Sequence, residues 1–354
     1  MFGMQTIAEF DDADPTAAQF AQLVCENRPA VFRRLPHHKI PTAAERETVL
    51  AAVGDLAEVK VAVTPNGFAD AIVDGVFCLP LESKMPLSEF YDLIDRENSD
   101  ESPQSVHYIQ SQNNNMRDGG DFINLFEHIP PDVPFATAAL GAQPDAVNFW
   151  CGTRHATTSF HKDHYENLYK VLAGSKTFHL ISPSESWALE ERSWETSQYV
   201  RRGAFGDSNE WGAAPVYIDP QTFETHVAET RTDEFELCKR GYTRMTTRWA
   251  SLDPSQTTRN SDHVSIFNSR VGAASGSLST VLTVTLMAGD MLYLPALWSH
   301  KVEQGRGITV AINYWYDMKF GTPVFLMHQL LRGIAADAGF MERDEEIGDA
   351  DEEF

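Results

Sequence analysis

The sequence lacks several features that would assign it to a class of protein at once. It has no run of about eighteen apolar residues, which a membrane-spanning helix requires. Residues 1–14 are acidic and contain no apolar signal-peptide core, so we expect a chain that is not secreted. The four cysteines, Cys25, Cys78, Cys151 and Cys238, lie far apart and form no CxxC pair. This argues against a disulfide framework or a zinc–thiolate site, and we expect a reduced, cytoplasmic chain, with the nucleus as the alternative location.

Basic residues are also scarce. The chain has 28 Lys+Arg against 51 Asp+Glu, which gives a formal net charge of −23. Nucleic-acid binders need Lys and Arg to neutralise phosphates, so we expect no nucleic-acid partner and, without an apolar span, no membrane partner. An acidic surface commonly serves solubility alone, and the alternative is attraction of a basic protein segment. Part of the excess lies in the acidic tail, residues 342–354, where we expect solvation without packing.

What is present indicates a large β-rich domain behind a mixed N-terminal region. Residues 1–105 alternate helical patterns (15–25, 41–53, 87–94) with strand patterns (30–32, 59–63, 71–77), and we expect them to pack on the next segment. A further strand is expected at 106–110. From residue 145 short β-rich runs are separated by Gly, Pro and Ser, which predicts a sandwich or barrel over residues 106–323. These runs are 147–150, 168–172, 177–181, 283–286, 291–294 and 308–315.

Two further segments accompany this barrel. Residues 187–280 are polar, with a Ser/Thr/Gly-rich part at 251–280, and such a long loop in a compact domain is either functional or partly disordered. We expect this insertion to overhang the site described next. Residues 324–341 predict a C-terminal amphipathic helix, from the spacing of Phe325, Leu326, Gln329, Leu330, Ile334 and Phe340. Its apolar face would either pack on the barrel or form a homodimer contact.

The most informative run is residues 157–167, in which His161 and Asp163 lie two residues apart. The flanks have strand character, and side chains two residues apart on an extended chain point to the same face. An imidazole and a carboxylate are suitable ligands for a divalent first-row metal. Two histidines and one carboxylate leave three coordination positions open, as in non-haem iron oxygenases. An isolated His-x-Asp pattern is a weak signal, so a second histidine must come from elsewhere.

His300 is the candidate for that second histidine. Gly289 and Asp290 are typical of a turn, residues 291–294 of a strand, and Pro295 of a strand end. We therefore expect His300 just past the end of a barrel strand, where its side chain can point into the barrel mouth. The rival ligands lack a paired-strand context or have the opposite strand parity; they are His155, His164, His179, His226 and His263.

Four stretches together resemble the jumonji-C (JmjC) 2-oxoglutarate oxygenases. They are DAVNFW at 145–150, TSFHKDHYENLY at 158–169, YLPALW at 293–298 and NYWYDM at 313–318. The similarity runs from about residue 20 to about residue 331 and points to the jumonji-C domain-containing protein seven subfamily of lysyl hydroxylases. The resemblance implies a double-stranded β-helix (jelly-roll, cupin-like) with flanking helices. It also implies iron(II) on His161, Asp163 and His300, 2-oxoglutarate as co-substrate and O2 as oxidant.

The resemblance implies a 2-oxoglutarate site as well. In the family, residues that match Tyr108, Thr158 and Lys176 bind the distal carboxylate of this co-substrate. Asparagines that match Asn167 and Asn313 line the other end, near the metal. These residue types suit a buried dianion, which needs a cation and hydroxyl donors. We expect no general acid or base beyond the metal ligands.

The resemblance further implies a substrate, a lysine of a translation-associated GTPase that is hydroxylated on a side-chain carbon. The acidic charge balance is compatible with a basic substrate. Alternatives with the same centre are removal of N-methyl groups from lysine and hydroxylation of an RNA base, which the net charge opposes. A peptidase role finds no HExxH helix or nucleophile triad in the sequence. A non-catalytic metal-binding barrel is the last alternative.

Overall fold

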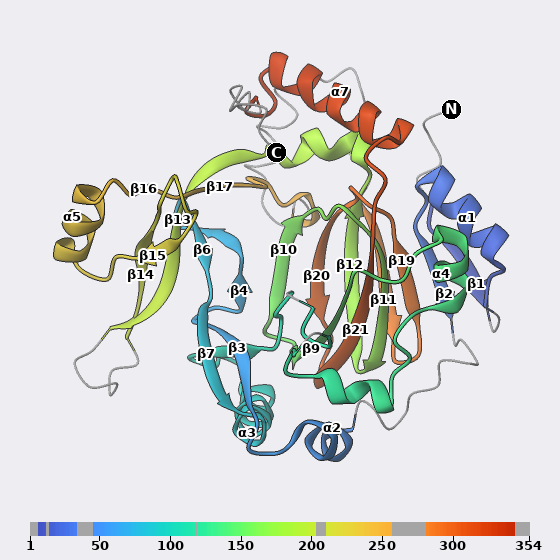
Figure 1. Ribbon diagram of the computed structural model, residues 1–354, viewed down its shortest axis with the longest axis horizontal. Helices are drawn as coiled ribbons and strands as arrows, with labels where there is room; N and C mark the ends of the chain where they lie inside the picture. The colour runs from blue at the N-terminus through green and yellow to red at the C-terminus, as the bar shows by residue number, and fades with distance from the viewer. Residues whose placement is uncertain are drawn as a thin grey trace.

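Two β-sheets face each other at the centre of the protein, seen in a computed structural model that describes residues 6–11, 14–33, 45–112, 114–117, 119–202, 210–256 and 281–343 (Figure 1). The first sheet contains β1 (Ala8–Asp11), β2 (Ala30–Arg33), β9 (Ala146–Thr153), β11 (Tyr165–Ala173), β19 (Met291–Leu294) and β21 (Ile308–Asp317). The second contains β4 (Phe68–Ala69), β10 (Thr157–His161), β12 (Ser175–Ile181), β18 (Leu282–Met287) and β20 (Ser299–Gln304). Their strand orders are β1-β2-β19-β11-β21-β9 and β18-β12-β20-β10-β4. The mainly β, jelly-roll fold expected from the sequence is confirmed.

The first sheet is buried on both faces, and its central strand shows why. Successive residues of a strand point to opposite faces. In β11, Tyr169 and Val171 belong to the core between the two sheets, whereas Leu168 belongs to a second core under the helices. A strand with two buried faces has a continuous apolar sequence instead of alternation. By contrast, β18 lies at a sheet edge, and its residues alternate between buried and exposed over much of its length.

Helices cover the outer face of the first sheet. α1 (Ala17–Glu26) begins with a capping box, in which the Thr16 hydroxyl accepts from the Gln19 amide. It packs against α4 (Pro134–Leu140), where the Phe20 and Phe135 rings lie 5.2 Å apart. α2 (Arg46–Val53) and α3 (Leu87–Ser99) lie below the barrel in the view of Figure 1. The three helices predicted in the N-terminal region are confirmed, with ends that differ by several residues.

The single strand predicted at 71–77 is wrong, because the chain makes a hairpin there. β5 (Ala71–Val73) pairs with β6 (Val76–Leu79) across a turn at Asp74 and Gly75, whose φ angles are 51° and 80°. Asp-Gly is the preferred sequence for two-residue hairpin turns with positive φ. The signal was therefore present in the sequence. A separate small sheet has the order β7-β3-β8 and contains β3 (Glu58–Thr64), β7 (Leu81–Pro86) and β8 (Val106–Tyr108).

Residues 187–280, expected as a polar insertion, contain a substantial part of a further sheet. The hairpin β5–β6 continues into β13 (Arg192–Arg202), β14 (Glu210–Ile218) and β15 (Thr225–Val227). β16 (Thr243–Arg244) and β17 (Thr246–Trp249) pair with β14 and β13, and α5 (Arg231–Lys239) lies at the outer end (Figure 1). Residues 257–280 of the Ser/Thr/Gly-rich part lie outside the described residues, as do residues 344–354 of the acidic tail.

The C-terminal helix, α7 (Pro323–Asp337), lies beside the 3-10 helix η3 (Pro183–Leu189) over one end of the barrel (Figure 1). It turns polar side chains inward, since His328 and Arg332 are 2% and 7% exposed. Three of its apolar residues face solvent, namely Leu326 (61%), Leu330 (57%) and Ile334 (55%), whereas Val324 and Phe325 pack against Ala296, Leu297 and Met318. The start of the helix therefore packs on the barrel, whereas the stripe of Leu326, Leu330 and Ile334 does not, and a homodimer contact through that stripe stays a prediction. No helix in the described ranges is long and apolar enough to cross a membrane.

Candidate metal centre and co-substrate pocket

His161, Asp163 and His300 come together at one end of the barrel. β10 pairs with β20 so that His161 lies directly opposite His300. Asp163 follows two residues beyond the end of β10, and its Oδ2 lies 4.0 Å from His161 Nε2 and 3.7 Å from His300 Nε2. One ligand atom from each residue lies within 4.8 Å of the other two. The three residues that the sequence singled out thus form one group that could hold a metal ion.

His300 lies inside a strand, and the prediction that it lies past a strand end is wrong. The chain turns after Pro295, with Leu297 at a φ of 71°, and then enters β20 at Ser299. β20 has the sequence SHKVEQ, and most of these polar residues are buried. Strand prediction depends on apolar alternation. A strand built from buried polar residues gives no such signal.

Both histidines present Nε2 to the centre. His161 Nδ1 donates to the Ser159 carbonyl at 2.9 Å, and His300 Nδ1 donates to the Trp298 carbonyl at 3.0 Å. Donation from Nδ1 fixes the tautomer and leaves the Nε2 lone pair available to a metal. Burial, followed by the nearby charge of His161, lowers the pKa of His300 to about 4. His300 is therefore a neutral imidazole, the form in which histidine binds metals.

Trp249 supports His161 from β17. The two rings are nearly parallel, with an interplanar angle of 4° and centroids 5.8 Å apart. The Trp249 indole N–H donates to Ser159 Oγ at 2.8 Å, and Ser159 is the residue whose carbonyl holds His161. The sequence analysis missed Trp249, because it lies in the segment expected to be a polar insertion and carries no motif of its own.

Lys162, between two of the ligand candidates, belongs to a buried ion-pair group. Its ammonium contacts the Glu191 carboxylate, and Arg332 Nη1 of α7 lies 2.5 Å from Glu191 Oε2. Burial alone would raise the pKa of Glu191, but the charges of Lys162 and Arg332 outweigh it and lower this pKa to about 2. The C-terminal helix is therefore tied, through one carboxylate, to the residue between His161 and Asp163.

Lys176 lies in the same pocket as the metal-ligand group. It is 1% exposed, its Nζ donates to the Tyr108 hydroxyl at 2.7 Å, and no carboxylate of the described residues pairs with it. Burial lowers the pKa of Lys176 to about 7. A buried lysine beside a hydroxyl, with no anion of its own, suits a ligand carboxylate. One cavity joins the two groups and is lined by Tyr108, Thr158, Asn167, Lys176, Asn313 and the three metal-ligand candidates.

The two asparagines lie between these groups with their amides fixed. Asn313 Nδ2 donates to Asn167 Oδ1 at 3.3 Å, and Asn313 Oδ1 accepts from Trp150 Nε1 at 2.9 Å. Trp315 also lines the cavity, and its buried indole N–H has no hydrogen-bond partner in the described part of the chain. A free buried donor is costly unless a ligand or water satisfies it. All five residues that the resemblance assigned to 2-oxoglutarate thus line one cavity, and its lysine, hydroxyl and amide groups are of the kind that a dianion needs.

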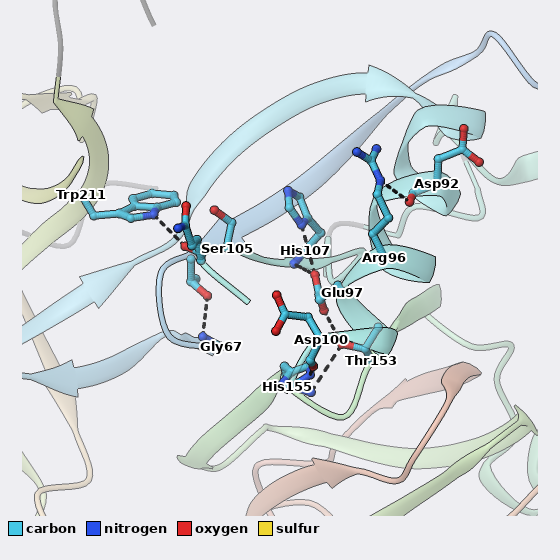
Figure 2. Close-up of polar contacts among 12 residues, drawn as sticks. Gly67, Asp92, Arg96, Glu97, Asp100, Ser105, His107, Thr153, His155 and Trp211 are labelled. Atoms are coloured by element: carbon cyan, nitrogen blue, oxygen red, sulfur yellow. Dashed lines mark hydrogen bonds and ion pairs between the residues drawn. The ribbon is translucent and has the colours of Figure 1, made fainter. Parts of the chain in front are cut away.

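Tyr108 is positioned from outside the barrel by Glu97 of α3. Figure 2 shows the Glu97 carboxylate between His107, of β8, and Thr153, at the end of β9. It accepts from the His107 backbone N–H at 2.9 Å, lies 3.1 Å from His107 Nδ1, and accepts from the Thr153 hydroxyl. Glu97 is 4% exposed, so these bonds form away from solvent. They hold β8, and with it Tyr108, against the barrel.

The rival histidines do not join the metal-ligand group. His164 stacks on Phe320, His179 Nδ1 lies 3.1 Å from Thr283 Oγ1, and His226 contacts Tyr242. His155 contacts the Asp100 carbonyl, as Figure 2 also shows. His263 lies outside the described residues. Among those residues, the group of His161, Asp163 and His300 is the cluster of metal-ligating side chains within bonding reach of one centre.

Comparison with known proteins agrees with this geometry. The family model of a cupin-like domain matches residues 15–322. The chain is 33% identical over 312 residues to the bifunctional peptidase and (3S)-lysyl hydroxylase JMJD7 of Homo sapiens, covering 87% of this chain and 84% of that relative. It is 29% identical to JmjC domain-containing protein E of Dictyostelium discoideum, covering 87% and 83%. It is 30% identical to lysine-specific demethylase JMJ32 of Arabidopsis thaliana, covering 87% and 81%.

The match covers the barrel and the N-terminal region together, and it spans every residue of the pocket. The shared fold, the extent of the match and the His-Asp-His group lead to one conclusion. The chain belongs to the cupin-like family of jumonji-C proteins.

Proposed function

We propose that this protein is an iron(II)- and 2-oxoglutarate-dependent hydroxylase that acts on a lysine side chain of a protein substrate. The observation that carries the proposal is the single cavity that joins a two-histidine, one-carboxylate group to the buried Lys176. This donor set is that of non-haem iron oxygenases. Iron(II), 2-oxoglutarate and O2 together supply the oxidising chemistry for hydroxylation, with succinate and carbon dioxide as the other products.

The chain's own residues would bind and orient the metal and 2-oxoglutarate. His161, Asp163 and His300 would hold the metal through the two Nε2 atoms and a carboxylate oxygen, which lie within 4.8 Å of one another. Lys176, Tyr108 and Thr158 line the same cavity and would bind the distal carboxylate of 2-oxoglutarate. Asn167 and Asn313 contact its other end. Aromatic side chains also line the cavity, namely Trp150, Tyr169 and Phe178, and would shield a bound co-substrate from water.

The substrate follows from the relatives and from charge. The human relative's name includes (3S)-lysyl hydroxylase, and we extend lysine hydroxylation at C3 to this chain, with a translation-associated GTPase as the protein substrate. The net charge of −23 supports a basic substrate. The second candidate is N-methyl-lysine demethylation, which the name of the Arabidopsis relative favours. We do not extend the peptidase activity in the human relative's name, because the sequence has no HExxH or nucleophile-triad pattern.

The test is succinate release by the purified chain with iron(II), ascorbate, 2-oxoglutarate and a lysine-containing GTPase peptide, followed by the peptide mass. We expect a gain of one oxygen on lysine. In His161→Ala, metal content and turnover should both fall by more than about a hundredfold while the fold is kept, because one of three ligands is lost. His179→Ala is the matched control, since His179 lies in β12 of the same sheet and outside the cavity.

Each other outcome has a distinct meaning. Loss of a methyl group from a methylated peptide, without oxygen gain on lysine, would select the demethylase reaction. Succinate release that no lysine peptide stimulates would keep the oxygenase chemistry and reject the substrate. No bound iron and no turnover would favour a non-catalytic barrel.

We also propose that two copies pair through the apolar face of α7, formed by Leu326, Leu330 and Ile334. Each of these side chains is more than half exposed, and an apolar stripe of this kind marks an interaction surface. Leu330→Glu should convert a dimer to a monomer in sedimentation analysis. Leu56→Glu is the control, because Leu56 is 76% exposed but lies outside α7. A wild-type chain that sediments as a monomer at micromolar concentration would contradict the proposal.

A further inference from the structure

The metal-ligand group opens onto a larger cleft of about 680 Å³. Barrel residues, including His161 and Asp163, form one wall, and residues of β3, β6, β13, β14 and β15 form the other. A cleft of this volume is in the range that encloses a small molecule or a side chain. If a lysine side chain is the substrate, as proposed above, its reacting carbon must reach the metal while its ammonium group lies elsewhere in this cleft.

The charged groups of the wall differ in whether they are already paired. Lys60 Nζ lies 3.2 Å from Glu82 Oε2, and these side chains are 39% and 61% exposed. Lys162 pairs with a carboxylate of its own, as described above. Asp70 has no cationic side chain within ion-pair distance among the described residues. Its Oδ2 accepts one hydrogen bond, from Gln110 Nε2 at 3.2 Å, and Gln110 also lines the cleft.

The backbone ties Asp70 to the metal-binding strand. β4 runs parallel to β10, with Ala69 opposite Thr158, and Asp70 follows directly. The Asp70 carbonyl accepts from Ser159 Oγ at 2.7 Å, and the Ser159 carbonyl accepts from His161 Nδ1 at 2.9 Å. Two hydrogen bonds, both made by Ser159, thus connect the Asp70 backbone to His161. These hydrogen bonds hold the Asp70 backbone close to the metal-ligand group.

The local conformation at Asp70 also points to a special role. Asp70 has a φ of 53°, in the left-handed region that non-glycine residues seldom adopt, although Asp and Asn tolerate it best. Gly67, three residues earlier, allows β4 to approach the barrel: a Cβ there would lie 1.8 Å from the His155 carbonyl oxygen. The Gly67 carbonyl in turn accepts from Thr157 N of β10 at 2.9 Å. The chain uses two uncommon backbone positions to hold one carboxylate at the cleft wall.

Aromatic rings complete the surroundings that a lysine side chain needs. Trp249 and Phe77 both line the cleft, with ring centroids 4.8 Å apart, and Trp249 is the ring that stacks on His161. A lysine buries its four-carbon stem against apolar surface and keeps its ammonium near a polar partner. Aromatic faces also attract cations. Two aromatic rings and one carboxylate without a cationic partner line the same cleft, and this combination matches such a side chain.

We propose that the Asp70 carboxylate is the anionic partner that receives the ammonium group of the substrate lysine. This inference rests on the proposed lysyl hydroxylase function and deepens it. C3 of lysine is four bonds from the ammonium nitrogen, so the reacting carbon and the charge occupy different parts of one cleft. Asp70 fixes the charged end, the aromatic wall packs along the stem, and the carbon that remains near the metal is thereby selected.

The test is a four-way comparison of two enzymes and two peptides. Wild type and Asp70→Asn are each titrated, without O2 and by fluorescence anisotropy, with a labelled GTPase peptide and with its lysine-to-norleucine counterpart. Norleucine keeps the stem and removes the ammonium. We expect Asp70→Asn to weaken lysine-peptide binding about ten- to a hundredfold, as for loss of one partner of a charge pair, and norleucine-peptide binding less than about twofold. KM for hydroxylation of the lysine peptide should rise by the same factor.

Asp74→Asn is the matched control. Asp74 has the same left-handed backbone, with a φ of 51°, but lies in the β5–β6 turn outside the cleft lining. It should change neither peptide's affinity. An equal effect of Asp70→Asn on both peptides, no effect on either, or no binding of the lysine peptide by wild type would overturn the proposal. If wild type distinguishes the peptides through Asp70 but adds no oxygen to lysine, the proposed reaction fails and the lysine site stands.

Discussion

Replacing Lys176 with methionine is expected to abolish 2-oxoglutarate binding while leaving the fold at least as stable as before. Methionine has a similar length and no charge, so it removes the cost of burying an ammonium group. The co-substrate loses its cationic partner, and truncation of one partner in a buried charge pair costs about 2–5 kcal/mol, roughly 30- to 5000-fold in affinity. Calorimetric titration with 2-oxoglutarate and urea unfolding measure the two effects separately.

The pH dependence of the same pair of proteins gives a second readout. Burial lowers the pKa of Lys176 from 10.5 to about 7 in the folded chain. Between these values the unfolded chain binds the extra proton, so this lysine makes folding more favourable as pH rises, by at most about 1.4 kcal/mol per pH unit. Below pH 7 Lys176 is charged in the folded chain as well, so burial of its ammonium group lowers the free energy of unfolding by the full amount. The stability advantage of Lys176→Met should therefore be largest below pH 7 and should shrink as the pH approaches 10.

Lys170→Met is the matched control for both measurements. Lys170 lies in β11, is also 1% exposed, and burial lowers its pKa to about 7 as well, but it does not line the cavity. Its substitution should leave 2-oxoglutarate affinity unchanged. Unchanged affinity in Lys176→Met would instead remove Lys176 from the co-substrate site, and equal losses in both variants would point to a general effect on the barrel.

The sequence predicted the metal-ligand group well because local geometry and motif agreed. His161 and Asp163 are close in sequence, so an extended chain was enough to predict that they lie on one side, although Asp163 in fact follows the end of β10. His300 came from a separate motif, and its partner across the ladder could not be deduced, since pairing of β10 with β20 depends on the register of the whole barrel. Strand prediction depends on apolar residues. It therefore found β11, which is apolar, and missed β20, whose residues are mostly polar.

The parts that the sequence missed depend on contacts between distant segments. Asp70 stands between two very short strands, and only the parallel pairing of β4 with β10 brings it to the cleft. Trp249 reaches His161 through the sheet that contains β13 and β17. The sequence left open which face of α7 is buried, for a different reason. Helical periodicity identifies the apolar side, but His328 and Arg332 are buried through polar partners, which periodicity does not reveal.

Replacing Glu191 with alanine is expected to destabilise the chain by about 3–5 kcal/mol, because it leaves Lys162 and Arg332 as buried charges without their shared carboxylate. Lys162 Nζ and Arg332 Nη1 both contact Glu191, and the side chains of Arg332 and Glu191 are 8% and 7% exposed. Urea unfolding of wild type and variant measures the difference. An exposed pair provides the contrast: Glu82→Ala removes the partner of Lys60, and it should cost no more than about 1 kcal/mol.

Acid titration separates the charge effect from packing. The folded pKa of Glu191 is about 2, below the ordinary value of 4.5, so its stabilising contribution is complete above pH 4.5 and is lost as pH falls toward 2. Wild type should therefore lose its advantage over Glu191→Ala across that interval. An advantage that persists at pH 2 would mean that Glu191 acts through packing alone.

Because of where Lys162 lies, loss of Glu191 should lower metal affinity as well as stability. Lys162 stands between His161 and Asp163, so the ion pair that holds it also restrains the backbone between two ligands. A restraint of this kind outside the coordination shell commonly changes metal affinity by about 10–100-fold when it is lost. Glu191→Ala should thus bind iron(II) more weakly even at temperatures where it stays folded, and Arg332→Met should do the same from the side of α7. Weaker metal binding in both variants, at full helical content, would establish that the C-terminal helix acts on the metal centre through this one carboxylate, whereas unchanged affinity would confine Glu191 to holding the helix in place.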